Sequence, residues 1–319
     1  MPAEVVGAAE SDDGRYVTAH ADGRVRVWSA PGTLETDFAA PLAAHDPPAI
    51  PGSLIAFVRP TGADPQIVVG AWLGGVAGHS LDGAVLWHRK DLRHVDRIAA
   101  LPAGDGRVLA GVVTARGPGL VLGPTGGTRH TIRGARFLAG GPDGAVVSQE
   151  RETAALRRAE VSPGPEAAAL RPAVVPQGRE TAALRQAVVP QGRETAVLRP
   201  AVDRPPAWRV ELGTFALLDA VVGEQTLLCG ADGRLRLVGA DGAERWRTSA
   251  RATGHITRIR ICREGPGWLC LTQGGRVQHA DAEGVLRPVG AVPWDTIGFV
   301  GPEHVIGPDG ALTQVRGAD

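Results

Sequence analysis

Short apolar runs separated by turn residues recur along most of the chain. In VVGAAESDDGRYVTAHADGRVRVWSAPG, residues 5–32, polar and apolar positions alternate on either side of two turns, Asp13-Gly14 and Asp22-Gly23. A period of two is typical of a β-strand with one buried face, and Asp-Gly supplies the positive φ angles that a tight hairpin requires. The pattern predicts consecutive antiparallel strands.

The same unit repeats at a regular distance. Comparable turns follow Asp22 at steps of roughly 35 to 50 residues, with one longer step of roughly 78, and a four-stranded propeller blade takes about 40–45 residues. They lie at Gly74-Gly75, Gly117-Pro118-Gly119, Asp232-Gly233, Gly274-Gly275 and Asp309-Gly310, with a further copy near residue 154. We therefore predict an all-β, seven-bladed β-propeller of four-stranded antiparallel blades, with six blades as the alternative count. The predicted blades span approximately 5–42, 43–92, 93–134, 135–211, 212–251, 252–291 and 292–319, and we expect the segment before Gly7 to complete the last one.

A second, shorter repeat explains the long step. The segments RETAAL, PEAAAL, RETAAL and RETAVL begin 14 residues apart, at 151, 165, 179 and 193. Each copy offers too few helix formers before AVVPQG for an isolated helix, which is marginal in water below about 12 residues. We predict one discontinuous propeller domain, 1–150 and 207–319, with a flexible insertion at 151–206 in blade four. A basic docking arm and additional β-strands are the alternatives for this insertion.

The first unit resembles a blade of the WD-repeat family. SDDGRYVTAHADGRVRVWSAPG has a Trp in the family's position, followed by Ser29 where the family has Asp, and Gly254-His255 matches the family's Gly-His pair. The resemblance implies a buried hydrogen-bonded set of His, second-strand Ser or Thr, turn Asp and Trp that fixes a blade. The structural positions that it implies are His45, His94, His255, Asp22, Trp28 and Asp232.

Other blades are similar to quinoprotein-like propeller repeats. GAVLWHRKDL, PAWRVELG and GAERWRTSA resemble the outer strand of those blades, which implies that Trp87, Trp208 and Trp246 pack between adjacent blades. Enzymes of that family bind pyrroloquinoline quinone and are generally exported, with a metal beside the cofactor. The chain shows neither a signal-peptide pattern nor a carboxylate cluster, so we expect the blade shape without the cofactor.

The composition limits which classes of partner and which cellular compartment are expected. Lys+Arg and Asp+Glu both number 34 and aromatic residues make up 4%, which disfavours nucleic acid because no positive field or stacking platform is provided. No apolar stretch reaches the roughly 18 residues of a membrane span, so we expect an unexported, cytoplasmic protein without membrane contact. Cys229, Cys262 and Cys270 lie in apolar runs without CxxC spacing, which predicts buried, reduced thiols.

Motifs for catalysis or metal binding are missing from the local sequence. The nine histidines form neither His-x-His nor His-Glu-x-x-His, and the chain contains neither Gly-x-Ser-x-Gly nor the Gly-Lys-Ser/Thr of a P-loop. We therefore expect no catalytic residue, cofactor or metal ion. The alternative is a propeller enzyme or small-ligand binder of the metal-dependent hydrolase or lactonase type, whose channel-centred site would be assembled from several blades.

These observations favour a non-enzymatic, monomeric scaffold that binds a protein partner. A closed ring of blades offers a wide, rigid face with variable loops, and the face formed by the inter-blade loops is the first candidate. Trp and Arg dominate binding hot spots, so the candidate anchors there are Trp72, Arg89 and Trp294, with core packing as the alternative role of each Trp. A third alternative, by analogy at the level of fold, is that the protein belongs to a bacterial multi-gene system that pairs a propeller with an ATPase.

Overall fold

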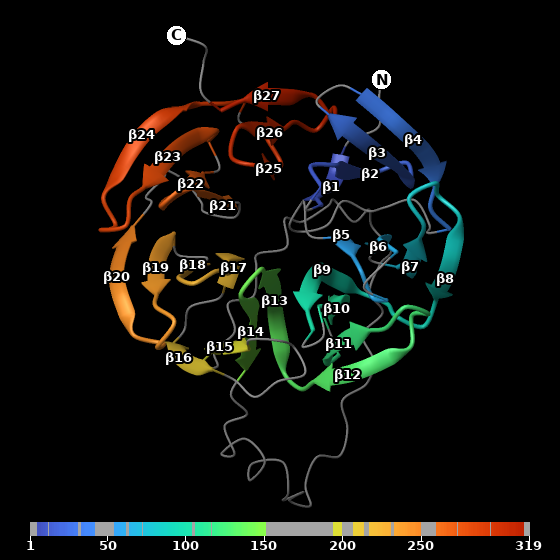
Figure 1. The fold of residues 1–319 in the computed structure, drawn as a ribbon, viewed down its shortest axis with the longest axis horizontal. Coiled ribbons are helices and arrows are strands. Elements are labelled where there is room, and N and C mark those ends of the chain that lie inside the picture. The colour runs from blue at the N-terminus through green and yellow to red at the C-terminus, as the bar shows by residue number, and fades with distance from the viewer. Residues whose placement is uncertain are drawn as a thin grey trace, which may run out of the picture.

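A computed structural model of the chain places its strands in a ring of seven antiparallel sheets (Figure 1). Within the residues that the structure describes, six sheets have four strands, the seventh has three, and no helix is present. The described residues are 5–11, 13–30, 33–41, 54–61, 64–71, 73–103, 106–115, 117–150, 194–199, 207–213, 217–230, 233–249, 260–272, 274–293 and 295–315. The all-β propeller predicted from the repeats is confirmed, with six complete blades and a shorter seventh.

The strands of each blade follow one another from the centre of the ring to its rim. Blade one contains β1 (Val5–Glu10), β2 (Tyr16–His20), β3 (Arg24–Ala30) and β4 (Thr33–Ala39). Blade two contains β5 (Ile55–Val58), β6 (Gln66–Ala71), β7 (Gly75–His79) and β8 (Val85–Arg89). Blade three contains β9 (Val95–Pro102), β10 (Val108–Thr114), β11 (Gly119–Leu122) and β12 (Thr128–Ile132).

The other blades have the same up-and-down order. Blade four contains β13 (Ala135–Gly141), β14 (Gly144–Glu150), β15 (Glu194–Arg199) and β16 (Trp208–Gly213). Blade five contains β17 (Leu217–Val221), β18 (Thr226–Gly230), β19 (Arg234–Val238) and β20 (Glu244–Ser249). Blade six contains β21 (Arg260–Glu264), β22 (Gly267–Leu271), β23 (Arg276–Ala280) and β24 (Leu286–Ala291), and blade seven contains β25 (Gly298–Val300), β26 (His304–Ile306) and β27 (Leu312–Gln314).

The apolar core lies between adjacent blades. Every residue of β2, β6, β18 and β22, each the second strand of its blade, is buried. Both faces of such a strand are covered by neighbouring blades, so these strands are mostly apolar and their few polar side chains, such as Thr18 and His20 of β2, are buried as well. The outer strands β4 and β24 are half-buried or exposed, as expected at the rim.

Aromatic residues of outer strands hold neighbouring blades together. In four blades, an aromatic side chain of the outer strand lies against a glycine in the last turn of the next blade. A Cβ atom on that glycine would lie only 2.5–2.7 Å from a carbon of the aromatic residue. The pairs are Phe38 with Gly83, Trp87 with Gly126, Trp208 with Gly242, and Trp246 with Gly284. The predicted packing of Trp87, Trp208 and Trp246 between blades is therefore confirmed.

Blade seven meets blade one directly and closes the ring. Val5 begins β1 and donates its backbone N–H to the carbonyl of Pro308, at 2.6 Å. Val5, Tyr16 and Ile306 belong to one buried cluster that joins the two blades. The expectation that the segment before Gly7 supplies a fourth strand to the last blade is wrong for residues 5 and 6, because they pair with β2 in blade one. Residues 1–4 lie outside the described residues.

Blade four corrects the boundary of the predicted insertion. The last tandem copy, RETAVL, provides β15, which pairs with β14 on one side and with β16 on the other. The third strand of blade four thus comes from residues assigned to the insertion 151–206, because a repeat unit rich in Thr, Ala and Val fits the strand position between two partners. Residues 151–193 and 200–206 lie outside the described residues, so their predicted flexibility stays untested.

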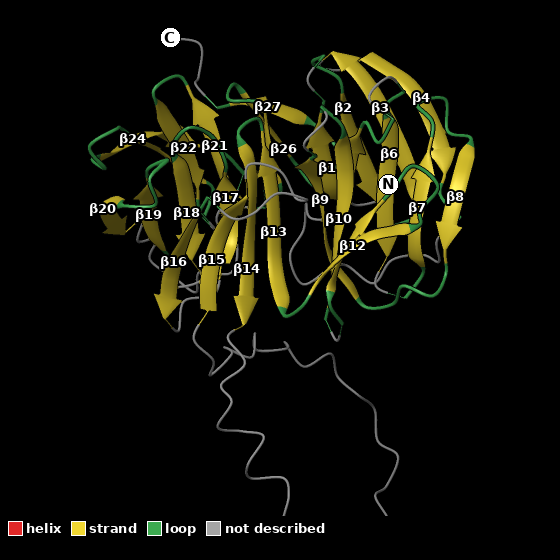
Figure 2. Cartoon of the chain, turned by 60° about the horizontal axis from the view of Figure 1, so that its bottom comes forward, coloured by secondary structure: helices red, strands yellow, loops and turns green. Residues whose placement is uncertain are grey.

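The strand order defines two faces of the ring (Figure 2). One face, which we call the crossover face, carries the segments that join one blade to the next and the turns between second and third strands. The opposite face, the hairpin face, carries the turns between first and second strands and between third and fourth strands. Since β14 and β15 are the second and third strands of blade four, β14 ends and β15 begins on the crossover face.

Candidate functional site

A chain of hydrogen bonds crosses blade one. The indole Nε1 of Trp28 on β3 donates to Thr18 Oγ1 on β2 at 3.2 Å, and Thr18 Oγ1 lies 2.9 Å from Nε2 of His20. Thr18 and His20 are completely buried, and the Trp28 ring stacks on Tyr16. Because the Thr18 hydroxyl accepts from the indole, its own proton is available to His20, and each group gains a partner.

This set resembles the one that the WD-repeat resemblance implied, with two differences. The second-strand Thr and Trp28 occupy the expected positions, but the histidine, His20, comes from the second strand itself. Asp22 is exposed, and its carboxylate accepts the backbone N–H of Arg24 at 3.0 Å, which stabilises the turn. The sequence contained the signal for His20, since residues two apart on a strand point to the same side.

The other predicted structural positions are only partly described. His94 lies in the segment between β8 and β9, and its φ of 55° makes it the non-glycine residue with positive φ in the described part of the chain. Its carbonyl accepts the N–H of Ala115, which connects that segment to blade three. His45, His255 and Asp232 lie outside the described residues, so their roles stay predictions.

Of the three expected partner anchors, the structure describes Arg89. Its guanidinium makes a bidentate ion pair with Asp91, in which both N–O distances are 2.7 Å. The same guanidinium donates a hydrogen bond to the carbonyl of Gly126 at 2.8 Å. These contacts attach the end of blade two to a turn of blade three, so Arg89 has a structural role whether or not it also binds a partner. Trp72 and Trp294 lie outside the described residues.

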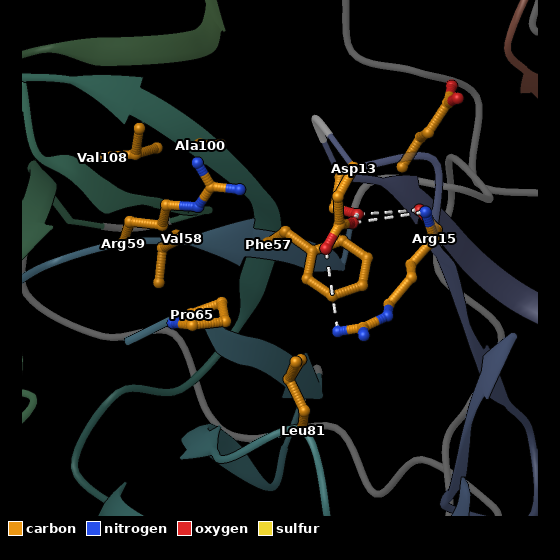
Figure 3. A pocket seen from close by; sticks show the side chains of 11 residues that line it. Asp13, Arg15, Phe57, Val58, Arg59, Pro65, Leu81, Ala100 and Val108 are labelled. Atoms are coloured by element: carbon orange, nitrogen blue, oxygen red, sulfur yellow. Dashed lines mark hydrogen bonds and ion pairs between the residues drawn. The ribbon is translucent and has the colours of Figure 1, made fainter. Parts of the chain in front are cut away.

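A hollow on the hairpin face joins blades one, two and three (Figure 3). It has a volume of about 90 Å³, and its apolar lining includes Phe57 at the end of β5, Pro65, and Leu81 in the turn between β7 and β8. Arg59 belongs to the wall shared with blade three, where its backbone exchanges two hydrogen bonds with Val108, at 2.8 and 3.0 Å. These two bonds fix the wall against blade three, and the pairing of β5 with β6 holds Phe57 in the floor.

Charges of both signs surround this floor. Arg15, in the turn between β1 and β2, lies between two carboxylates, 3.7 Å from Asp13 and 3.4 Å from Glu35. The hydroxyl of Ser11 donates to Asp13 and lowers the pKa of that carboxyl. Burial raises the pKa of Glu10, against the opposing effect of a backbone N–H of Gly301. An apolar floor with a rim of both charges suits an apolar anchor flanked by polar groups.

Sequence reasoning did not select the residues of this hollow. Asp13 and Gly14 form the predicted hairpin turn, and neither Phe57 nor Leu81 was among the predicted site residues. Each residue is ordinary within its own blade, and only the ring brings the three blades together. The sequence held no local signal that would have identified the hollow.

Metal-ligating side chains do not gather in the described part of the chain. Among these residues, no group of three or more His, Cys, Asp or Glu side chains is arranged to hold a metal ion. Cys229 and Cys270 are buried free thiols, as predicted, whereas Cys262 is half-buried. Burial raises the pKa of Cys270 to about 12, which keeps it in the unreactive thiol form. Where the structure describes the chain, no helix is long and apolar enough to cross a membrane.

Comparison with known proteins places the chain by its fold. No protein-family model and no curated protein matches it. Among solved structures, BamB from Moraxella catarrhalis is 14% identical with a TM-score of 0.55, covering 97% of this chain and 84% of BamB. BBS1N, solved in complex with ARL6DN, is 14% identical with a TM-score of 0.58, covering 98% of this chain and 91% of BBS1N. The chain therefore shares the β-propeller fold of these proteins.

Proposed function

We propose that the protein is a non-enzymatic, cytoplasmic scaffold that binds a partner protein through the hollow on its hairpin face. The observation that carries the proposal is the combination of a fixed apolar floor at Phe57, Pro65 and Leu81 with a charged rim at Asp13 and Arg15. A floor held by three blades needs little ordering on binding, which favours affinity because less conformational entropy is lost.

The chemistry of the hollow indicates what the partner presents. The cavity of about 90 Å³ accommodates one apolar side chain, and the rim offers Arg15 and Arg59 together with Glu10 and Asp13. We expect an apolar anchor with charged residues of both signs beside it. The structure of BBS1N in complex with ARL6DN supports this proposal only in showing that a protein of similar fold was solved in a complex.

The test compares two leucine substitutions in the same blade on opposite faces. Leu81→Arg places a long charged side chain in the hollow, whereas Leu73→Arg changes an exposed leucine, 58% accessible, in the turn between β6 and β7 on the crossover face. The tagged full chain and both variants are used for affinity purification from native extract, and the recovered partner is then purified and its Kd measured for each form. Circular dichroism confirms that the variants are folded.

The two variants separate the two faces. Loss of the partner with Leu81→Arg and retention with Leu73→Arg supports the hairpin-face hollow. The opposite result moves binding to the crossover face, the face of the inter-blade connections that the sequence favoured first. Retention of the partner at unchanged Kd by both variants contradicts the proposed site.

A further inference from the structure

Four innermost strands pair irregularly near their start; in β1 the residue that follows the irregularity is Gly7, and the other three, β9, β13 and β17, set up a second site in the centre of the ring. The pairing of β9 with β10, of β13 with β14 and of β17 with β18 shifts by one residue near the start of the inner strand. Such β-bulges re-aim the side chains that follow them and are common beside functional sites. The residues that follow the three bulges are Arg97, Phe137 and Asp219.

These side chains are held in place by contacts between blades. The Arg97 guanidinium donates through Nη2 to the carbonyl of Leu218 at 2.8 Å, and its Cζ lies 4.2 Å from the centre of the Phe137 ring. Arg97 of blade three thus extends over blade four to blade five. The Asp219 carboxylate accepts the backbone N–H of Ile261, at 3.0 Å, and of Ala220, at 3.1 Å. The guanidinium and the carboxylate are therefore preorganised.

The cavity beside these residues is large enough for a small molecule. Its volume is about 180 Å³, and residues from blades one, three, five, six and seven line it, which places it in the central channel. Arg97, Asp219 and Arg260 provide its polar side, and Ala8, Ile297 and Phe299 its apolar side. The polar side has two guanidinium groups for one carboxylate.

The charges in this cavity favour an anion. Burial lowers the pKa of Arg97 to about 10, an effect that Asp219 and, more weakly, Asp96 oppose and that the positive charge of Arg260 reinforces. Arg97 remains protonated at neutral pH, so the two arginines repel each other in a partly desolvated space. A carboxylate between them removes this repulsion and accepts charge-assisted hydrogen bonds, which are about twice as strong as neutral ones.

We propose that the central channel binds a small monocarboxylate, distinct from the partner protein of the hairpin face. Its carboxylate contacts the guanidinium groups of Arg97 and Arg260, and its short carbon chain packs against Phe299 and Ile297. A doubly charged anion such as phosphate fits less well, because Asp219 repels it and the apolar wall gives it no partner.

The test uses two probes of the same shape and two arginines of the same strand. Propionate and propionamide are titrated into the purified full chain by isothermal titration calorimetry. Arg260→Gln removes one guanidinium of the site. Arg263→Gln is the matched control, because Arg263 is exposed, donates to the Gly265 carbonyl and packs on Trp268 away from the cavity. We expect propionate to bind the wild type and Arg263→Gln, and to bind Arg260→Gln about 10- to 100-fold more weakly.

A third variant shifts affinity in the opposite direction. Asp219→Asn keeps an oxygen acceptor for a backbone N–H but removes the negative charge, so propionate binding becomes tighter. Asp219→Asn also tests the site if thermal unfolding without ligand shows that Arg260→Gln is not folded. Equal binding of propionamide, unchanged propionate affinity in both site variants, or no propionate binding to the wild type would each overturn the proposal. None of these results bears on the hairpin-face hollow, which is tested separately.

Discussion

A substitution at Gly126 measures how strongly the packing between blades two and three contributes to the free energy of unfolding. Gly126 lies in the turn between β11 and β12 with a φ of +74°, and its backbone N–H donates to the Gly123 carbonyl. Trp87 of blade two covers it, so that an added Cβ would lie 2.6 Å from Trp87 Cε3. The indole cannot move away freely, because its Nε1 donates to Gln66 Oε1 and the side chain is buried. Gly126→Ala therefore adds both backbone strain and a clash.

The two effects can be separated within the same blade. Gly106, in the turn between β9 and β10, has a φ of +79° and nothing within 4 Å of an added Cβ. Gly106→Ala should cost only the left-handed conformation, about 1–2 kcal/mol. Gly126→Ala should cost that amount plus about 1–3 kcal/mol of overpacking against Trp87. The predicted difference between the variants is thus the overpacking energy alone.

Equilibrium urea unfolding, followed by circular dichroism and tryptophan fluorescence, measures both losses. A further variant, Trp87→Ala, removes the aromatic ring, and in its background Gly126→Ala should cost no more than Gly106→Ala. Equal losses for the two alanine substitutions in the wild-type background would show that Trp87 yields without cost. In that case the packing of an aromatic residue on a glycine would not be what holds the blades together.

Three other measurements test separate parts of the structure. Thr18→Val should lower the free energy of unfolding by about 1–3 kcal/mol, because it removes a buried hydroxyl that both Trp28 and His20 contact. The control Thr131→Val, at an exposed position of β12, should change it by less than about 0.5 kcal/mol. Equal effects of the two substitutions in urea unfolding would contradict the hydrogen-bonded chain. Replacing 151–193 with an Asn-Gly turn keeps β15 and should leave a cooperative thermal unfolding transition. Deleting 151–206 removes β15 and should abolish that transition. A normal transition for the deletion variant would show that β15 is dispensable. Burial raises the pKa of Cys270 to about 12, so its thiol should resist iodoacetamide at pH 8 in the folded protein and react in denaturant. Peptide mass spectrometry measures the modification. Rapid modification of Cys270 in the native protein would contradict this prediction.

Much of the fold was predictable because blade repeats are local. Alternating strands and Asp-Gly turns identified the blades, since a hairpin is formed by neighbouring residues. The inter-blade packing of Trp87, Trp208 and Trp246, which the resemblance to quinoprotein-like repeats implied, was correct. The predicted limit of the insertion was wrong because a strand in the middle of a blade depends on its two partners, and the copy at 193 differs from the copies at 151 and 179 by a single residue in six, Val197 in place of Ala.

The sequence by itself determined the repeating unit, the all-β class and the residues that form turns. These properties depend on residues close together in the chain, where spacing and conformational preference are sufficient. Only the tertiary structure decided which histidine completes the hydrogen-bonded set of blade one, and which residues form the hairpin-face hollow and the channel site. Arg97, Asp219 and Arg260 belong to three different blades and are more than 40 residues apart in sequence. Their proximity follows from closure of the ring, which brings the first strand of every blade to the same centre.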